Sequence, residues 1–223
     1  MLVLGIDTSS DIVVSSLFDG VGVVGTSTQP GTQAHGELLA PGIDTVLRDA
    51  GRSPGDLTHV VVGVGPGPFT GLRVGVVTAL VMGEALGVPV LGVCSLDVVA
   101  LASAGHDGLV GGFSVITDAR RKEVYVARYD AEGRRVTVPI VARPDDLDAE
   151  IRVSPVVGAG ALLYADQFSD VRSSAALDAT ALAAVSGGIA LGSQQFEALA
   201  PRPLYLRRPD AVENVHRKRV TPS

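Results

Sequence analysis

The sequence has few of the residues on which disulfide-rich, zinc-binding or base-stacking proteins depend. Its 223 residues include one cysteine, Cys94, no tryptophan, five phenylalanines and four tyrosines. A single cysteine excludes a disulfide framework and a zinc site with four cysteine ligands. So few aromatic rings argue against a surface on which successive bases stack. We therefore expect a protein of the reducing cytoplasm, and a stand-alone nucleic-acid-binding domain is disfavoured.

The sequence also lacks common catalytic and metal-binding patterns. Its histidines, His35, His59, His106 and His216, are too far apart in sequence to form a two-histidine metal site on one helix. There is no G-x-S-x-G nucleophile motif, and Cys94 in an apolar segment is more typical of packing than of a nucleophile. The pattern predicts no metal, no cofactor and no complete catalytic set.

No segment reads as a targeting peptide or a membrane span. The first residues, Met1–Asp7, have no basic region and no cleavage site, so we expect an opening strand there. Glu84 and a turn at Gly87–Pro89 interrupt the most apolar stretch, Val74–Cys94. It predicts a buried helix followed by a buried strand, and no contact with a membrane.

The charge is acidic overall, with a basic end. Lysine and arginine number 18 against 24 aspartates and glutamates, which gives a net charge of −6. The segment Ala200–Ser223 is basic, with Arg202, Arg207, Arg208, Arg217, Lys218 and Arg219 against Asp210 and Glu213. Such a tail can contact phosphate, and a solvated terminus is the alternative.

The order of predicted elements indicates an α/β fold. Strands are predicted over 2–7, 12–18, 21–28, 59–64 and 88–93, and helices over 34–50, 72–86 (with Thr70 as N-cap) and 95–104. The second half repeats this order in degenerate form, with strands over 113–117, 123–129, 135–142 and 153–157 and helices over 144–151, 160–168 and 179–198. We therefore predict two lobes of one architectural type, residues 1–104 and 105–223.

Two candidate sites follow the first and fourth strands. Asp7 and Thr8 could place a carboxylate and a hydroxyl beside a metal-bound phosphate, although such residues also stabilise turns. The loop Gly65–Gly71 precedes a helix, but Pro66 and Pro68 each remove an amide donor that an anion would need. An ATPase or phosphotransferase would use these residues with Asp118 and a turn at Ser186-Gly187-Gly188.

A stripe of small residues runs along the predicted helix 72–86 and the residue before it. Gly71, Gly75, Ala79 and Gly83 recur every fourth residue. Glycine inside a helix costs about 0.8–1 kcal/mol relative to alanine, so three on one stripe need a packing reason. The stripe packs closely either against another helix or against the chain's own sheet.

Six stretches, in this order and spacing, resemble the TsaB (YeaZ) family. They are LGIDTSS (4–10), AHGELLAPGI (34–43), GVGPGPFTGLRVGV (63–76), GVPVLGVCSLDVVA (87–100), DARRKEVYVARY (118–129) and PLYLR (203–207). The stretches reach across nearly the whole chain, and the second half matches less closely. Pro68 stands where the family usually has serine, which weakens any reading of that loop as an anion site.

The resemblance implies a two-lobed actin-like ATPase fold of the Hsp70/hexokinase/actin, ribonuclease H-like type, with a degenerate second lobe. It also implies a non-catalytic role in making N6-threonylcarbamoyladenosine in tRNAs that read codons beginning with A. The catalytic paralogue TsaD holds a metal through paired histidines, whereas His35 has no partner here. The implied partners are TsaD, the ATPase TsaE and, indirectly, tRNA, with a homodimer when the chain is alone.

The family's contact with TsaD uses the two helices of the first lobe. By resemblance, the interface would include the small-residue stripe and its apolar neighbours, namely Leu38, Leu39, Ile43, Gly71, Leu72, Gly75, Ala79 and Gly83.

Overall fold

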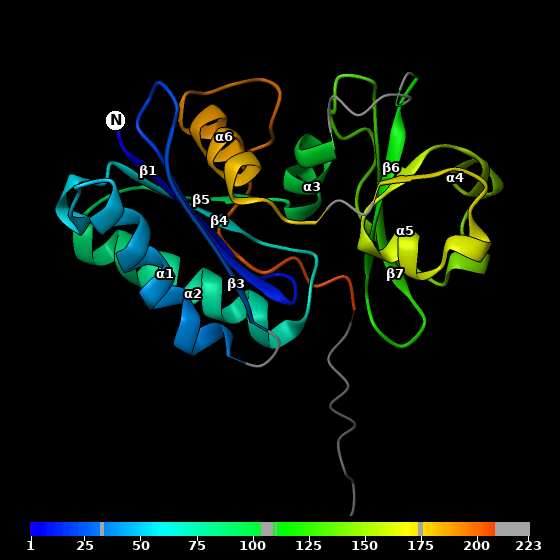
Figure 1. Ribbon diagram of the computed structural model, residues 1–223, viewed down its shortest axis with the longest axis horizontal. Helices are drawn as coiled ribbons and strands as arrows, with labels where there is room; N and C mark the ends of the chain where they lie inside the picture. Colours follow the sequence, from blue (N-terminus) through cyan, green and yellow to red (C-terminus); the bar gives the residue numbers. More distant parts are fainter. Residues whose placement is uncertain (32–33, 104–108, 110, 174–175, 208–223) are drawn as a thin grey trace, which may run out of the picture.

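The computed structural model describes residues 1–31, 34–103, 109, 111–173 and 176–207, which form two five-stranded sheets with helices (Figure 1). The strands are β1 (Val3–Asp7), β2 (Ile12–Phe18), β3 (Val23–Pro30), β4 (His59–Gly63), β5 (Val90–Val93), β6 (Phe113–Asp118), β7 (Val124–Tyr129), β8 (Ile140–Ala142), β9 (Val156–Val157) and β10 (Val171–Ser173). The α-helices are α1 (His35–Asp49), α2 (Phe69–Leu86), α3 (Ser95–Ser103), α4 (Ala149–Val153), α5 (Ala159–Leu163) and α6 (Ala179–Ala190). Three short 3-10 helices complete the list, η1 (Pro54–Asp56), η2 (Pro144–Asp146) and η3 (Ala165–Gln167).

The first sheet has the order β3-β2-β1-β4-β5. β1, β2 and β3 pair antiparallel as a meander, whereas β4 and β5 run parallel to β1. The β-branched run of β4 is buried from Val60 onward, because helices cover both faces of the sheet at this point.

The second sheet repeats the first. Its order is β10-β9-β6-β7-β8, so that β8, β7, β6, β9 and β10 stand where β3, β2, β1, β4 and β5 stand in the first sheet. The pairings also repeat, antiparallel for β6 with β7 and β7 with β8, and parallel for β6 with β9 and β9 with β10. The copy is reduced, because β9 has two residues and α4 and α5 have five each. This confirms the repeated order predicted from the sequence.

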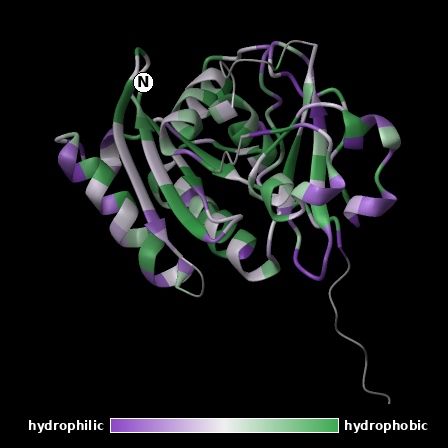
Figure 2. Ribbon diagram, turned by 45° about the vertical axis from the view of Figure 1, so that its right-hand side comes forward, coloured by the Kyte–Doolittle hydropathy of each residue, from purple (hydrophilic) through white to green (hydrophobic). Residues whose placement is uncertain are grey.

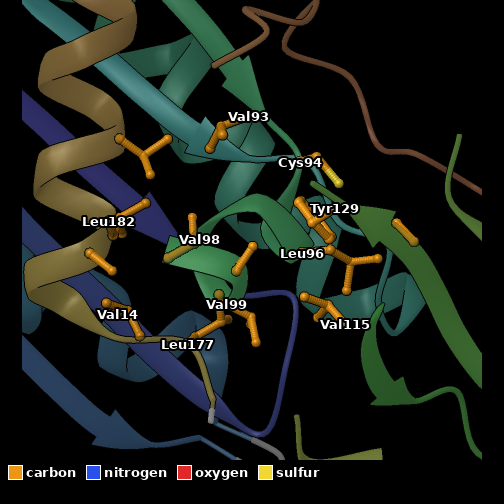
Figure 3. Close-up of a cluster of buried hydrophobic side chains, with 14 of the residues drawn as sticks. Val14, Val93, Cys94, Leu96, Val98, Val99, Val115, Tyr129, Leu177 and Leu182 are labelled. Atoms are coloured by element: carbon orange, nitrogen blue, oxygen red, sulfur yellow. The ribbon is translucent and has the colours of Figure 1, made fainter. Parts of the chain in front are cut away.

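Helices pack on both faces of the first sheet. α1 and α2 cover one face with the apolar cluster around Leu4, Ile6 and Val62, and α1 carries alternating hydrophobic and hydrophilic residues (Figure 2). α3 and α6 cover the other face. There Leu96 and Leu182 pack in a cluster that extends to the second sheet (Figure 3).

The chain returns to the first sheet near its end. α6 contacts β1 and β2, the backbones of Leu199 and Gly92 exchange two hydrogen bonds, and the Leu204 amide donates to the Val64 carbonyl. These elements come from the half of the sequence, 105–223, that we assigned to the second lobe. The first sheet is therefore completed by residues from both halves of the chain.

Several predicted boundaries are wrong. Pro68, not Thr70, precedes α2 at the N-cap. The predicted strand 135–142 is regular only over β8, because Thr137 Oγ1 accepts the Arg128 amide and Pro139 has no amide to donate. The helix predicted over 179–198 ends at Ala190 in α6. Gly192, just beyond this end, has a left-handed φ of 73°, which is typical of glycine at the end of a helix. β10 had not been predicted. The residues 104–112 between the predicted helix 95–104 and the predicted strand 113–117 lie largely outside the described residues, and the basic tail beyond Arg207 lies wholly outside them.

The small-residue stripe of α2 faces the chain's own sheet. A Cβ atom added at Gly71 would lie 2.3 Å from the Thr8 carbonyl oxygen, and one at Gly83 would lie 2.1 Å from Val90 Cγ2. Ala79 is fully buried. The sequence allowed two packing partners for this stripe, another helix or the chain's own sheet, and in the structure the partner is the sheet. The small residues therefore set how closely α2 approaches β1 and β5.

α2 is long and apolar enough to cross a membrane by length and composition. Its buried residues lie against the sheet, as in the core helix of a globular protein, and its other face is exposed.

We expect Gly71→Ala to destabilise the fold although alanine is the better helix former. The added methyl would meet a backbone oxygen at 2.3 Å, and the resulting shift of α2 should cost about 1–3 kcal/mol of unfolding free energy. Urea denaturation measures this cost. Gly36→Ala in α1 is the matched control, because nothing lies within 4 Å of its Cβ position, and it should stabilise by up to about 1 kcal/mol. Equal stability of the Gly71 variant and the wild type would show that α2 can move freely.

Candidate functional site

Asp7 ends β1 and is completely buried. Its Oδ1 accepts the Ser9 amide at 2.7 Å, and its Oδ2 accepts the Ser95 hydroxyl at 2.7 Å. Ser95 Oγ in turn accepts the Gly65 amide at 3.1 Å. The carboxylate thus joins the end of β1 to the start of α3 and to the loop after β4.

Thr8 joins the same strand end to α2. Its Oγ1 donates to the Gly71 carbonyl at 2.7 Å and accepts the Gly75 amide at 3.1 Å. The Thr8 hydroxyl therefore donates one hydrogen bond and accepts one, both within the protein.

Backbone approaches Asp7 and Ser9 closely from the other side. A Cβ atom at Gly63 would lie 1.9 Å from Asp7 Oδ2, and one at Gly67 would lie 2.1 Å from the Ser9 carbonyl oxygen. Only glycine fits at these two positions. The space around the carboxylate is occupied by the chain itself.

Burial raises the pKa of Asp7 above its ordinary value of 3.8, and the hydrogen bonds from Ser9 and Ser95 oppose that rise. A carboxylate that is buried and bonded internally in this way acts as a structural link. The polar side-chain atoms of both predicted site residues, Asp7 and Thr8, therefore form their hydrogen bonds with other parts of the chain.

A cleft of about 190 Å³ lies between the two lobes. Its walls include Ser10, Pro66, Leu96 and Leu177, and an ion pair of Arg120 with Asp11 at 2.7 Å joins the two lobes beside it. Ligand pockets commonly measure about 300–1,000 Å³. The cleft is smaller than that range.

Of the remaining residues of the enzymatic hypothesis, Asp118 lines the cleft together with Pro66 and Pro68, whereas Ser186-Gly187-Gly188 does not line it. Asp118 is bonded to Arg120, both to its amide at 2.8 Å and to its guanidinium at 3.2 Å. The predicted turn Ser186-Gly187-Gly188 is wrong, because these residues lie inside α6 on the first sheet. A Cβ atom at Gly187 would meet the Phe18 ring at 2.5 Å, so this segment is a packing contact.

His35 and Cys94 both have structural environments. His35, the first residue of α1, donates from Nε2 to the Ser10 carbonyl at 2.7 Å. Cys94 is fully buried, and burial raises the pKa of its thiol, so the thiol stays protonated. Within the described residues there is no group of three or more His, Cys, Asp or Glu side chains placed to hold a metal ion.

The residues expected at a partner interface lie mostly inside the protein. Besides the small-residue stripe, Leu72 and Leu39 are buried at 0% and 1% exposure and Ile43 at 7%, while Leu38 is partly buried. These side chains position α1 and α2 on the sheet.

None of the predicted interface residues of α2 lies on its opposite face, which carries exposed apolar side chains. Val77, Leu80 and Val81 are exposed at 56%, 43% and 62%. Beside them a groove of about 560 Å³ runs between α1 and α2, lined by residues that include Ala40 and Met82. The signal was present, because Val77, Leu80 and Val81 lie off the stripe of small residues that packs on the sheet.

The burial of Asp7 predicts a pH-dependent effect of Asp7→Asn. Since the native pKa lies above 3.8, the folded protein binds this proton more tightly than the unfolded chain. The wild type should therefore lose stability relative to the variant as pH rises from 3.8 to the native pKa, and keep that loss above it. Urea unfolding of both proteins at several pH values measures the difference in their unfolding free energies. A difference that does not change with pH would contradict a buried, titrating Asp7.

Comparisons with known proteins agree on one family. The family model described as TsaD, tRNA N6-adenosine threonylcarbamoyltransferase, matches residues 19–153. An uncharacterised protein of Mycobacterium tuberculosis is 41% identical over 94% of this chain and 93% of its own length. The tRNA threonylcarbamoyladenosine biosynthesis protein TsaB of Bacillus subtilis is 34% identical over 58% of this chain and 55% of its own length.

The fold agrees with solved structures. A Pseudomonas aeruginosa protein described as similar to the peptidase YeaZ superposes with a TM-score of 0.77 at 25% identity, covering 92% of this chain and 99% of that one. YeaZ of the same organism superposes with a TM-score of 0.76 over the same shares, at 24% identity. The predicted two-lobed actin-like α/β fold is confirmed, and the chain belongs to the TsaB (YeaZ) family.

Proposed function

We propose that this chain is a non-catalytic subunit in the biosynthesis of N6-threonylcarbamoyladenosine at position 37 of tRNAs that read codons beginning with A. The relatives from Bacillus subtilis and Escherichia coli are both named tRNA threonylcarbamoyladenosine biosynthesis protein TsaB. On this proposal the chain works in the cytosol beside a catalytic paralogue of the TsaD type.

The observation that carries the proposal is the exposed apolar face of α2. Val77, Leu80 and Val81 form a hydrophobic surface on a long helix, next to the groove against α1. Contiguous exposed apolar patches of this kind mark protein interaction sites. A partner helix laid in the groove would cover the patch and complete a helix-on-helix layer outside the sheet.

The occupant we propose is the TsaD-like paralogue. A family model named for TsaD matches this chain, so the paralogue has related first-lobe helices that can pack in a similar way. When the paralogue is absent, the same face pairs with a second copy of the chain. A TsaE-like ATPase joins the assembly, and tRNA meets this subunit mainly through the paralogue.

The internal bonding of Asp7 and Thr8 supports the non-catalytic role. Their polar atoms link β1 to α2, α3 and the loop after β4, and the cleft between the lobes is small. A phosphotransferase of this fold would instead need a carboxylate directed at a bound nucleotide and metal.

Val81→Glu tests the docking face. Val81 is 62% exposed, so the variant should fold normally, but a glutamate buried without a partner in an apolar interface costs about 3 kcal/mol or more. We expect the variant to lose co-purification with the TsaD-like paralogue, and reconstituted tRNA modification to fall with it.

Val138→Glu is the matched control. Val138 is 75% exposed and lies between β7 and β8 in the second lobe, so the same change there should leave binding and modification intact. If the Val81 variant binds and supports modification like the wild type, α2 is not the docking face. If omission of the whole chain leaves modification unchanged, the proposed function fails.

A further inference from the structure

A partly buried arginine in the second lobe has no side-chain partner within the described residues. Arg152 lies in α4, and its Nε atom is buried without a hydrogen-bond partner. Glu150, two residues earlier, pairs with Arg128, and Asp170 pairs with Arg172. A buried charged donor without a partner costs free energy, so a water molecule or a ligand is needed to satisfy it.

Arg152 lines a pocket of about 330 Å³. One wall of this pocket comes from α4, through Ala149 and Val153, and the other comes from residues 166–169, where η3 ends. The Ser169 amide donates to the Arg152 carbonyl at 2.8 Å, and this hydrogen bond holds the two walls together. The volume lies within the range of small-molecule sites. We call this site the α4 pocket.

The α4 pocket also contains a carboxylate without a cationic partner. Asp166 is exposed, and its Oδ2 accepts a hydrogen bond from Gln167 Nε2 at 3.1 Å. In the part of the chain that the structure describes, no basic side chain forms an ion pair with Asp166, and Arg152 and Asp166 do not pair with each other. Two opposite charges therefore line one pocket, and neither neutralises the other by contact.

The rest of the wall supplies apolar surface and a hydroxyl group. Val153 is 64% exposed, and Phe168 forms part of the wall although most of its side chain is buried. Ser169 is exposed and adds its hydroxyl to the same wall. A ligand that fits the α4 pocket therefore carries one negative group, one positive group and a short apolar part.

We propose that the α4 pocket binds a free α-amino acid, with its carboxylate on the Arg152 guanidinium and its ammonium group on Asp166. A guanidinium matches a carboxylate through two parallel N–H donors. Phosphate fits less well because Asp166 repels it, and a simple amine fits less well because Arg152 repels it. A zwitterion satisfies both charges at once, and its side chain lies against Val153 and Phe168.

The α4 pocket is separate from the face proposed for partner docking. α4 lies at the opposite end of the molecule from α1 and α2 (Figure 1), and the pocket shares no residue with the groove between those two helices. Binding of an amino acid here therefore depends neither on a partner protein nor on the role in tRNA modification.

The test is a titration of the isotope-labelled full-length protein with L-alanine, followed by heteronuclear NMR. The signals of the Arg152 Nε–H group and the Ser169 amide should shift, because both residues line the pocket. Acetate and ethylamine each carry one of the two charged groups of the amino acid. Each should bind about tenfold or more weakly than L-alanine, since each lacks one charge-assisted contact.

Arg152→Gln and Asp166→Asn should each weaken L-alanine binding by about tenfold or more. Asp166 is exposed, so its variant should fold normally even where the Arg152 variant loses stability. Arg152→Lys keeps the charge without the two parallel donors and should retain part of the affinity. Arg134→Gln is the matched control, because Arg134 is exposed and lines a different pocket, and it should bind like the wild type.

Three results would overturn the proposal. The first is the absence of any shift up to about 50 mM L-alanine, far above a Kd of about 1 mM, which would leave water as the partner of Arg152. The second is binding that both Arg152→Gln and Asp166→Asn leave unchanged, which would place the amino acid elsewhere. The third is acetate binding as tight as that of L-alanine, which would show an anion site in which Asp166 takes no part.

Discussion

The closeness of α2 to the first sheet is the constraint on which the rest of the structure depends. The Thr8 hydroxyl bonds to backbone atoms of Gly71 and Gly75, and this is possible only where the helix has no side chains toward β1. The helix is anchored by its backbone along the strand end. Apolar residues that lie off this stripe, such as Val77 and Val81, are exposed on the outer face.

Asp7, at the same end of β1, is also enclosed by the chain itself. The end of β1 lies near the cleft between the lobes, since Ser9 and Ser10 line that cleft. Here Ser9 and Ser95 occupy both carboxylate oxygens, and Gly63 brings backbone against the group. Burial of the carboxyl group is tolerated because each of its oxygens accepts a hydrogen bond from the protein. The Asp7 carboxylate therefore helps to hold α3 and the loop after β4 in place, through Ser95.

The order of elements could be predicted from the sequence because each depends on local signals, such as the β-branched run of β4 and Gly87 after α2. The orientation of α2 could not, because a stripe of small residues allows close packing against a helix and a sheet equally well. The candidate residues Asp7 and Thr8 are neighbours in the sequence, but their hydrogen-bond partners, such as Ser95 and Gly71, depend on tertiary structure. The contacts of Leu199 with Gly92 and of Leu204 with Val64 need the return of the chain, which no local pattern indicates.

The return of α6 to the first sheet also bears on how the protein is made. During synthesis the first sheet can form, with α1 and α2 on one face, as soon as the residues up to Val93 have emerged from the ribosome. α3 follows directly and covers part of the other face, but the rest of that face stays exposed until α6, Ala179–Ala190, has been made. Contacts between such distant segments are slow to form, and the uncovered β1 and β2 surface can associate wrongly in the meantime. The protein therefore reaches its stable form only near the end of translation, and an early stop would release a half-covered, aggregation-prone sheet.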